Sequence, residues 1–219
     1  MLGLDALVQR FNDFGLALPE PGGCYGHVLA PGGADVTLLA LTNAYRALAD
    51  GGLWSPVAGL RAPGGLQAGD QAVGAQAAGG RAAGNPSAAN TAPRPRRVAD
   101  ATAVHLVGHS VADNNARAGT FKLDRALTTR GFAAVKTGTS KDLRDNWCIG
   151  FTDRYTVGVR VGNARGEAMH AVSGTSGTSG TSGTSGATPV WRALVQPLHA
   201  DRSPRPPPPP PGVEAVAIT

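Results

Sequence analysis

The chain has 219 residues, a net charge of +5, 31 glycines, 17 prolines and only 5% aromatic residues. So much glycine and proline with so few aromatic side chains argues against one large core built from the whole length. The positive charge lies mainly in scattered arginines, and no aromatic residue lies among Arg94, Arg96 and Arg97, so we expect no nucleic-acid partner. The sequence has no apolar run of roughly 18 residues and no basic region at its start, so we expect no membrane span and a cytoplasmic chain.

The first predicted element is an amphipathic helix over residues 4–14. Gly15 is a suitable stop, and a loop rich in glycine and proline follows up to Asp35. The apolar residues that recur at helical spacing are Leu4, Leu7, Val8 and Phe11.

A second helix is predicted over 36–50, with Asp35 as its N-cap and Gly51 and Gly52 at its end. Asn43 and Arg46 are expected on its other faces. Its apolar face is expected to comprise Leu38, Leu41, Tyr45 and Leu48.

Residues 56–97 contain mostly glycine, alanine, proline, glutamine, asparagine and arginine. Such a composition buries too little apolar surface to offset the entropy lost on ordering. The sequence therefore predicts a disordered insertion.

A third helix is predicted over 100–114, with Asp100 as its N-cap. His105 and His109 lie one turn apart, a spacing that can bind zinc. The H-E-x-x-H pattern needs a glutamate where the chain has Leu106, and no third ligand is indicated, so we expect no metal site.

Three strands are predicted next, at 131–137, 146–152 and 155–161. The turn between the last two is short, which predicts an antiparallel hairpin. Cys148 lies within a strand pattern and is expected to be buried, whereas Cys24 lies in a glycine-rich loop. A disulfide between them requires the fold to bring them together.

Residues 173–186 form a Ser-Gly-Thr repeat typical of a flexible linker. A last helix is predicted after it, with Thr188 as N-cap, Pro189 at its first position and Pro197 breaking its last turn. Residues 204–211 are a polyproline spacer. The expected apolar face of the helix is Trp191, Leu194, Val195 and Leu198.

The stretch 131–140 carries the clearest chemistry. Lys136 supplies a cation at the end of a short apolar run. Thr137 and Thr139 are two apart, so on a strand they share a face. Gly138 between them lets a ligand or another backbone approach closely. A strand edge of this kind suits a carboxylate next to an amide.

Lys136, Thr137 and Gly138 match the K-T-G element of the serine acyltransferases that bind penicillin. Residues 145–151 and 155–159 resemble the strands that follow K-T-G in penicillin-binding transpeptidases, and 37–45 resembles the helix that precedes it. The chain most resembles the transpeptidase domain of bifunctional class A penicillin-binding proteins, in the branch called penicillin-binding protein 1C. The resemblance covers the C-terminal half of that domain.

The resemblance implies an α+β fold: a partial penicillin-binding transpeptidase (β-lactamase-like) domain, with an antiparallel sheet flanked by helices and long disordered insertions. The expected parts of this fragment are a helical N-terminal part (1–55), the disordered insertion (56–97), the K-T-G sheet with its helix (98–172), the repeat linker (173–186), a C-terminal helix (187–203) and the polyproline tail (204–219).

The implied reaction is peptidoglycan cross-linking by serine acyl transfer, with a stem peptide or a β-lactam as ligand and no cofactor. In the full-length family the same protein is also a peptidoglycan glycosyltransferase, anchored in the inner membrane with its catalytic domain in the periplasm. The resemblance assigns substrate binding to Lys136, Thr137, Gly138 and Thr139, and supporting roles to Ser140 and Asp145.

The catalytic residues of the family are missing. No serine lies three residues before a lysine, because those positions are Gly119, Ala133 and Gly138, and no asparagine has a serine two residues before it. Without S-x-x-K and S-x-N the chain has no nucleophile and no base, and we expect it to be inactive alone.

Two other interpretations stay open. The chain could be a non-enzymatic remnant of a degraded reading frame, with at most weak polyanion binding. Alternatively, it could be one half of a split enzyme that docks onto the missing N-terminal half.

Overall fold

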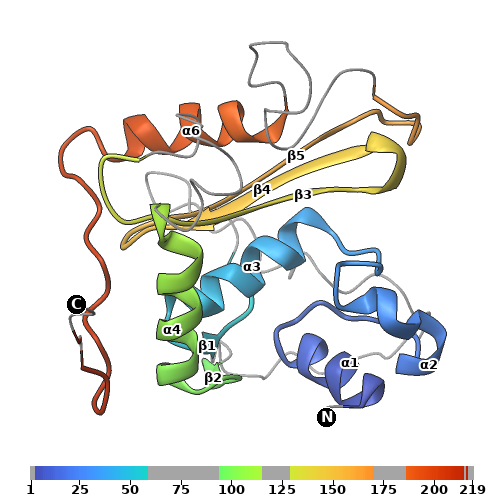
Figure 1. Ribbon diagram of the computed structural model, residues 1–219, viewed down its shortest axis with the longest axis horizontal. Coiled ribbons are helices and arrows are strands. Elements are labelled where there is room, and N and C mark those ends of the chain that lie inside the picture. The colour runs from blue at the N-terminus through green and yellow to red at the C-terminus, as the bar shows by residue number, and fades with distance from the viewer. Residues whose placement is uncertain (1–2, 59–93, 115–128, 170–185, 215, 217–219) are drawn as a thin grey trace, which may run out of the picture.

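The computed structural model describes residues 3–58, 94–114, 129–169, 186–214 and 216 (Figure 1). Its centre is an antiparallel sheet in the order β3-β4-β5, with β3 spanning Ala134–Thr139, β4 Asp145–Phe151 and β5 Thr156–Gly162. The three strands and the antiparallel hairpin predicted from the sequence are confirmed.

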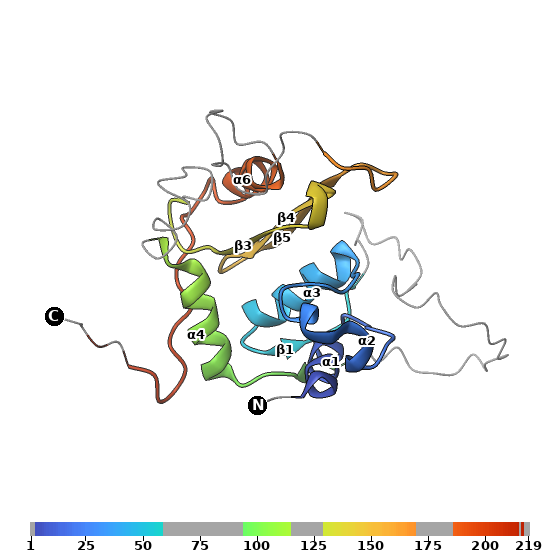
Figure 2. The ribbon, with the colours of Figure 1, turned by 45° about the vertical axis from the view of Figure 1, so that its right-hand side comes forward.

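Helices cover both faces of this sheet. Helix α6 (Ala187–Leu198) lies on one face, and α3 (Leu38–Ala49) and α4 (Ala101–Ala112) lie on the other side (Figures 1 and 2). The mixed α/β architecture with a small antiparallel sheet agrees with the expected class. No helix in the described ranges is both long and apolar enough to span a bilayer.

The main core lies between the sheet and α6. The indole of Trp191 is fully buried and donates a hydrogen bond to the Val157 carbonyl at 3.0 Å. Gly150 makes room for it, since a Cβ there would lie only 3.0 Å from the indole. The buried residues of this core are Ala133, Val135, Cys148, Val159, Ala187, Trp191 and Val195.

A second core lies in the N-terminal part, where α1 (Leu4–Asp13) packs with α2 (Gly22–Tyr25) and a 3₁₀ turn, η1 (Gly26–Leu29). The prediction of a plain loop between 15 and 35 was wrong here. The α2 turn depends on contacts with residues distant in the sequence. The Gly22 amide donates to the Asp5 carboxylate at 2.7 Å, and Gly22 lies against the backbone of Leu4. The buried residues of this core are Val8, Leu18 and Leu29.

Helix α3 begins at Leu38, two residues later than predicted, because Thr37 and not Asp35 is its N-cap. The Thr37 hydroxyl accepts a hydrogen bond from the Ala40 amide at 3.1 Å. The predicted end is confirmed, with Gly51 and Gly52 at positive φ of 64° and 91°.

Asn43 lies in the middle of α3 and, although it is outside the predicted apolar face, its side chain is buried. Its amide donates to the Ser55 carbonyl at 3.1 Å and accepts from Arg46 at 2.9 Å. Arg46 also binds the Ser55 hydroxyl at 2.8 Å. These contacts fix the chain that leaves β1 (Leu53–Trp54).

Part of the predicted disordered insertion is ordered. Strand β2 (Arg96–Arg97) pairs with β1, and the Arg96 guanidinium lies 4.7 Å from the ring centre of Trp54. Residues 59–93 lie outside the described residues. Helix α4 follows, and Asp100 caps it as predicted, accepting from the amides of Thr102 and Ala103.

Helix α6 begins earlier than predicted. Its N-cap is Gly186 at φ 138°, so Thr188 and Pro189 are its second and third residues. Glycine tolerates this backbone conformation, and the early start buries Thr188. The helix ends one residue after Pro197, as a proline near the last turn predicts. The repeat at 173–185 lies outside the described residues.

Two residues of the predicted apolar face of α6 do not reach the core. Trp191 and Val195 are buried, whereas Leu194 and Leu198 are 48% and 38% exposed. The contact with the sheet is therefore a narrower stripe than the apolar pattern suggests.

Candidate functional site

Strand β3 contains all four residues of the K-T-G-T stretch, Lys136 to Thr139. Within the described part of the chain, β3 pairs only with β4, so its other edge carries backbone groups without a strand partner. This edge is the candidate functional site.

Alternation along β3 separates the cation from the hydroxyl groups. Thr137 pairs with Cys148, which belongs to the core under α6, so Thr137 and Thr139 are on the α6 face. Lys136 and Gly138 are on the opposite face, with α3 and α4. The two threonines share a face as predicted, but the lysine does not share it with them.

Lys136 is exposed, and its ammonium group donates to the Thr137 carbonyl at 2.7 Å. An ammonium group has three donors, so this one bond leaves capacity for an anion. The surface over Gly138 is open, because among the described residues a Cβ there would meet only the Cβ of Trp147, at 3.8 Å. A cation beside a bare stretch of backbone can receive a carboxylate on a closely approaching chain.

Ser140 and Asp145 close the turn between β3 and β4. The Ser140 hydroxyl accepts from the Asp145 amide at 2.8 Å, and the Ser140 amide donates to the Asp145 carbonyl at 2.9 Å. Both residues thus hold the turn at the end of β3.

Arg160, on β5, organises the surface beside Asp145 and Trp147. Its guanidinium forms an ion pair with the Asp145 carboxylate and lies 5.6 Å from the ring centre of Trp147, its partner in the β4–β5 register. Register alone would have revealed this pairing, but only once the strand ends were known.

Asn146 lies directly behind the site, opposite Thr139 on the α6 side of the sheet. It is completely buried, and neither atom of its side-chain amide has a hydrogen-bond partner among the described residues. An unpaired buried polar group costs about 1–3 kcal/mol. This position is therefore a weak point in the packing behind β3.

The two histidines of α4 lie close together, with ring centres 4.3 Å apart, and His109 also faces Phe132 at 5.5 Å. Burial and the neighbouring His105 both lower the pKa of His109. In the described ranges no three metal-ligating side chains gather in one place. Cys24 is exposed and Cys148 is buried, and the two form no disulfide.

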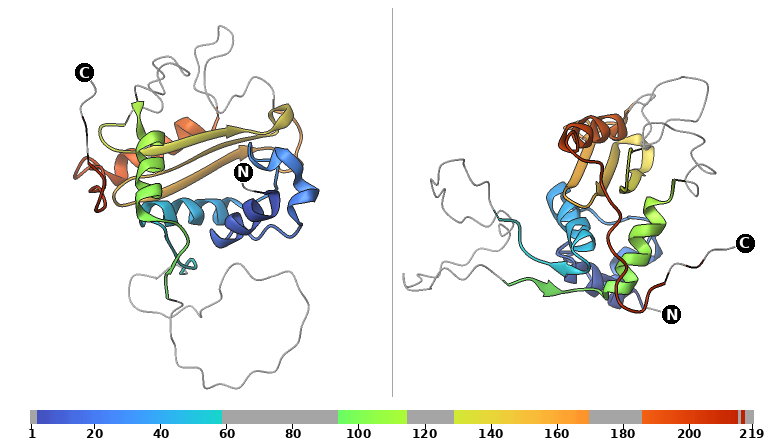
Figure 3. Two further views of the ribbon diagram at one scale, coloured as in Figure 1. Left: turned by 60° about the horizontal axis from the view of Figure 1, so that its bottom comes forward. Right: turned by 90° about the vertical axis from the view of Figure 1, so that its left-hand side faces the viewer.

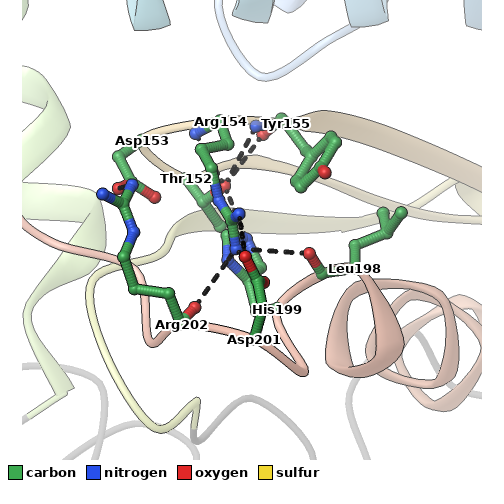
Figure 4. A network of polar contacts seen from close by, with 8 residues as sticks. All are labelled: Thr152, Asp153, Arg154, Tyr155, Leu198, His199, Asp201 and Arg202. Atoms are coloured by element: carbon green, nitrogen blue, oxygen red, sulfur yellow. Dashed lines mark hydrogen bonds and ion pairs between the residues drawn. The ribbon is translucent and has the colours of Figure 1, made fainter.

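A second polar cluster, which the sequence did not reveal, joins the β4–β5 turn to the chain after α6 (Figure 4). Arg154 donates to both carboxylate oxygens of Asp201, at 2.9 and 2.8 Å, and Arg202 donates to Asp153 at 2.6 Å. The hydrogen bond from Arg154 lowers the pKa of Asp201 to about 2. We call these residues, with Thr152, Tyr155 and His199, the C-terminal clamp.

The clamp does not form a nucleophile–base pair, although His199 lies 3.0 Å from the Thr152 hydroxyl. Arg154 is always a donor and lies 2.9 Å from Nδ1 of His199, so Nδ1 accepts and Nε2 carries the proton. The imidazole therefore donates to Thr152 and cannot remove its proton. The same hydroxyl oxygen accepts from the Tyr155 amide at 3.1 Å, which is a structural role.

Comparisons with known proteins identify no family: no protein-family model matches the chain, and no curated protein matches it.

Proposed function

We propose that this chain is the C-terminal half of a penicillin-binding transpeptidase domain, and that β3 binds the terminal carboxylate of a stem peptide or a β-lactam. The observation that carries the proposal is the position of Lys136 and Gly138. An exposed cation and an open glycine lie together on a strand whose second edge has no strand partner among the described residues and can accept an extended ligand.

Each of these residues would have its own role in binding the ligand. Lys136 would neutralise the carboxylate of the ligand, since a lysine ammonium acts as a point charge for anions. The free edge of β3 would hydrogen-bond the ligand's main chain as an added strand, as sheet edges do for extended peptides. Gly138 would allow close approach, and Thr139 would add a hydroxyl at the end of the strand.

Acyl transfer needs a nucleophile and a base besides a binding strand. The residue three before Lys136 is Ala133, and no serine stands at the required spacing from any lysine of the chain. The chain would therefore bind without reacting. Cross-linking, and the glycosyltransferase activity of the parent, would belong to a protein that also carries the missing elements.

Exposed apolar residues beside the sheet support docking to the missing half. Leu106 and Val107 on α4 are 54% and 51% exposed, although each belongs to a helix that packs on the sheet. In a complete domain such residues would be covered by other helices.

Polyanion binding, the rival proposal, has less support. Arg10, Arg144, Arg154, Arg160 and Arg202 each form an ion pair with an aspartate, which leaves less free positive charge than the composition suggests. Binding to nucleic acid that weakens steeply with salt would favour it instead.

The test is reconstitution. The purified chain would be mixed with the N-terminal half of a class A penicillin-binding transpeptidase domain that carries S-x-x-K and S-x-N, and labelled with fluorescent penicillin. We expect no covalent labelling of this chain in either case, and increased labelling of the added half when both are present.

Lys136→Ala should abolish that increase, whereas Arg165→Ala, a matched loss of one exposed cation outside β3, should leave it unchanged. Equal labelling with and without this chain would contradict the split-domain proposal. Covalent labelling of this chain itself would contradict the expected lack of a nucleophile.

A further inference from the structure

The chain after α6 contains an unusual run of prolines. Pro204 and Arg205 are followed by six consecutive prolines, 206–211. Proline fixes φ near −65° and keeps the preceding residue out of the α-helical region. The run therefore forms a polyproline II helix, which has three residues per turn and so three edges.

Burial along this segment repeats every three residues. Pro204 is buried, and Pro207 and Pro210 are half-buried, whereas Arg205, Pro206, Pro208 and Pro209 are exposed. The polyproline helix ends in a turn, in which the Val213 amide donates to the Pro210 carbonyl at 3.1 Å. One edge of the polyproline helix thus lies against the domain, and the other two face solvent.

The first turn of the segment is anchored to the strand region. The Phe132 amide donates to the Pro204 carbonyl at 3.1 Å, and Gly131 lies directly against Pro204. From there the chain runs along the side of the molecule on which α4 lies (Figures 1 and 3). The hydrogen bond between Phe132 and Pro204 holds one edge of the polyproline helix against the domain and leaves the other two edges exposed to solvent.

Protein modules that recognise polyproline II use this geometry. They take up prolines from two edges in grooves lined by aromatic side chains, and the third edge points away. Arg205, Pro208 and Pro211 follow each other at intervals of three and so lie on one exposed edge. Arg205 has no ion-pair partner among the described residues, so a carboxylate beside such a groove could pair with it.

We infer that residues 205–211 are a docking surface for a protein module with an aromatic-lined, acidic-flanked polyproline groove of the SH3 kind. The inference does not depend on the transpeptidase proposal, because it uses none of the residues of β3.

The test is a calorimetric titration of the full chain with a recombinant SH3 domain that binds polyproline ligands. We expect saturable binding. Arg205→Glu should weaken it about tenfold or more, which is 1.4 kcal/mol for each factor of ten. Arg165→Glu makes the same change of charge at another exposed position and should change the affinity less than twofold.

A neighbouring pair of substitutions tests the assignment of edges. Pro208→Ala, on an exposed edge, should weaken binding about tenfold, whereas Pro207→Ala, on the packed edge, should change it less than twofold. Hydrogen exchange gives a second measurement, in which the Phe132 amide should be protected in the free chain and stay protected in the complex.

Absence of binding would overturn the inference, as would equal effects of the two arginine substitutions. Equal effects of the two proline substitutions, or an unprotected Phe132 amide in the free chain or the complex, would overturn the assignment of one packed and two presented edges.

Discussion

Arg154 and Asp201 form a bidentate ion pair that joins the β4–β5 turn to the segment after α6, with both nitrogen–oxygen distances below 3 Å. The same guanidinium donates to the Leu198 and Arg202 carbonyls, at 3.3 and 3.2 Å (Figure 4). A planar guanidinium suits this set of acceptors, which a lysine could not satisfy together. The clamp therefore holds α6 against the hairpin at its C-terminal end.

The first prediction concerns the pH dependence of this clamp. The pKa of Asp201 falls from its ordinary value of 3.8 to about 2 in the folded chain, because it accepts the hydrogen bond from Arg154. A lowered folded-state pKa stabilises the fold above the unfolded value, and the contribution is lost as pH falls from about 4 toward 2. Asp201→Asn should lower the urea midpoint at pH 6, and this effect should shrink as the pH falls toward 2. A difference between the two chains that persists unchanged at pH 2 would contradict this assignment.

The second prediction separates two candidate caps of α3. Thr37→Ala should lower the free energy of unfolding by about 1 kcal/mol, because it removes the acceptor of the Ala40 amide. Asp35→Ala should be nearly neutral, since Asp35 lies two residues before the cap. Urea denaturation of both variants measures the difference. A larger loss of unfolding free energy in Asp35→Ala than in Thr37→Ala would show that Asp35 is the N-cap, as the sequence predicts.

Local signals predicted some elements well and others badly. Asp100 was identified as a cap because it immediately precedes an apolar-periodic segment, and the amides of Thr102 and Ala103 are its own neighbours. At residue 35 two capping residues compete within three positions, and sequence alone favoured the wrong one. Helix start signals are informative about existence and less so about position.

Features that depend on distant contacts were not predictable. The turn at Gly22 forms against Leu4 and Asp5, and the C-terminal clamp joins residues 47 positions apart in the sequence. Within β3, strand alternation correctly placed Thr137 and Thr139 on one face. Which face of the sheet is covered by α6 depends on where that helix begins, and its start was predicted too late.

The third prediction concerns the packing of α3 on the sheet. A Cβ at Gly158 would overlap the Thr42 hydroxyl and lie 3.2 Å from both Thr42 Cβ and a Leu38 methyl group. Gly158→Ala should therefore destabilise the fold by about 1–3 kcal/mol, as overpacking of a core does.

Gly23→Ala is the matched control, since no atom of the described ranges is found within 4 Å of the added Cβ. Its melting temperature should equal that of the parent chain or exceed it. If Gly158→Ala melts no lower than Gly23→Ala, then α3 does not pack on β5 as closely as described.

The fourth prediction compares two buried asparagines. The amide of Asn43 has partners in Ser55 and Arg46, so Asn43→Val should cost about 1–3 kcal/mol by leaving those groups unpaired. The amide of Asn146 has none among the described residues, so Asn146→Val should raise the free energy of unfolding by about 1 kcal/mol. Thermal unfolding of both variants should shift in opposite directions.

This comparison also bears on the proposed function. Replacing Asn146 fills the space behind β3 with an apolar side chain and leaves Lys136 and Gly138 unchanged on the opposite face. If β3 binds carboxylates through that face, Asn146→Val should reconstitute penicillin labelling as well as the parent chain. A variant that is more stable yet fails to reconstitute would show that the α6 side of β3, and not its lysine side, meets the missing half.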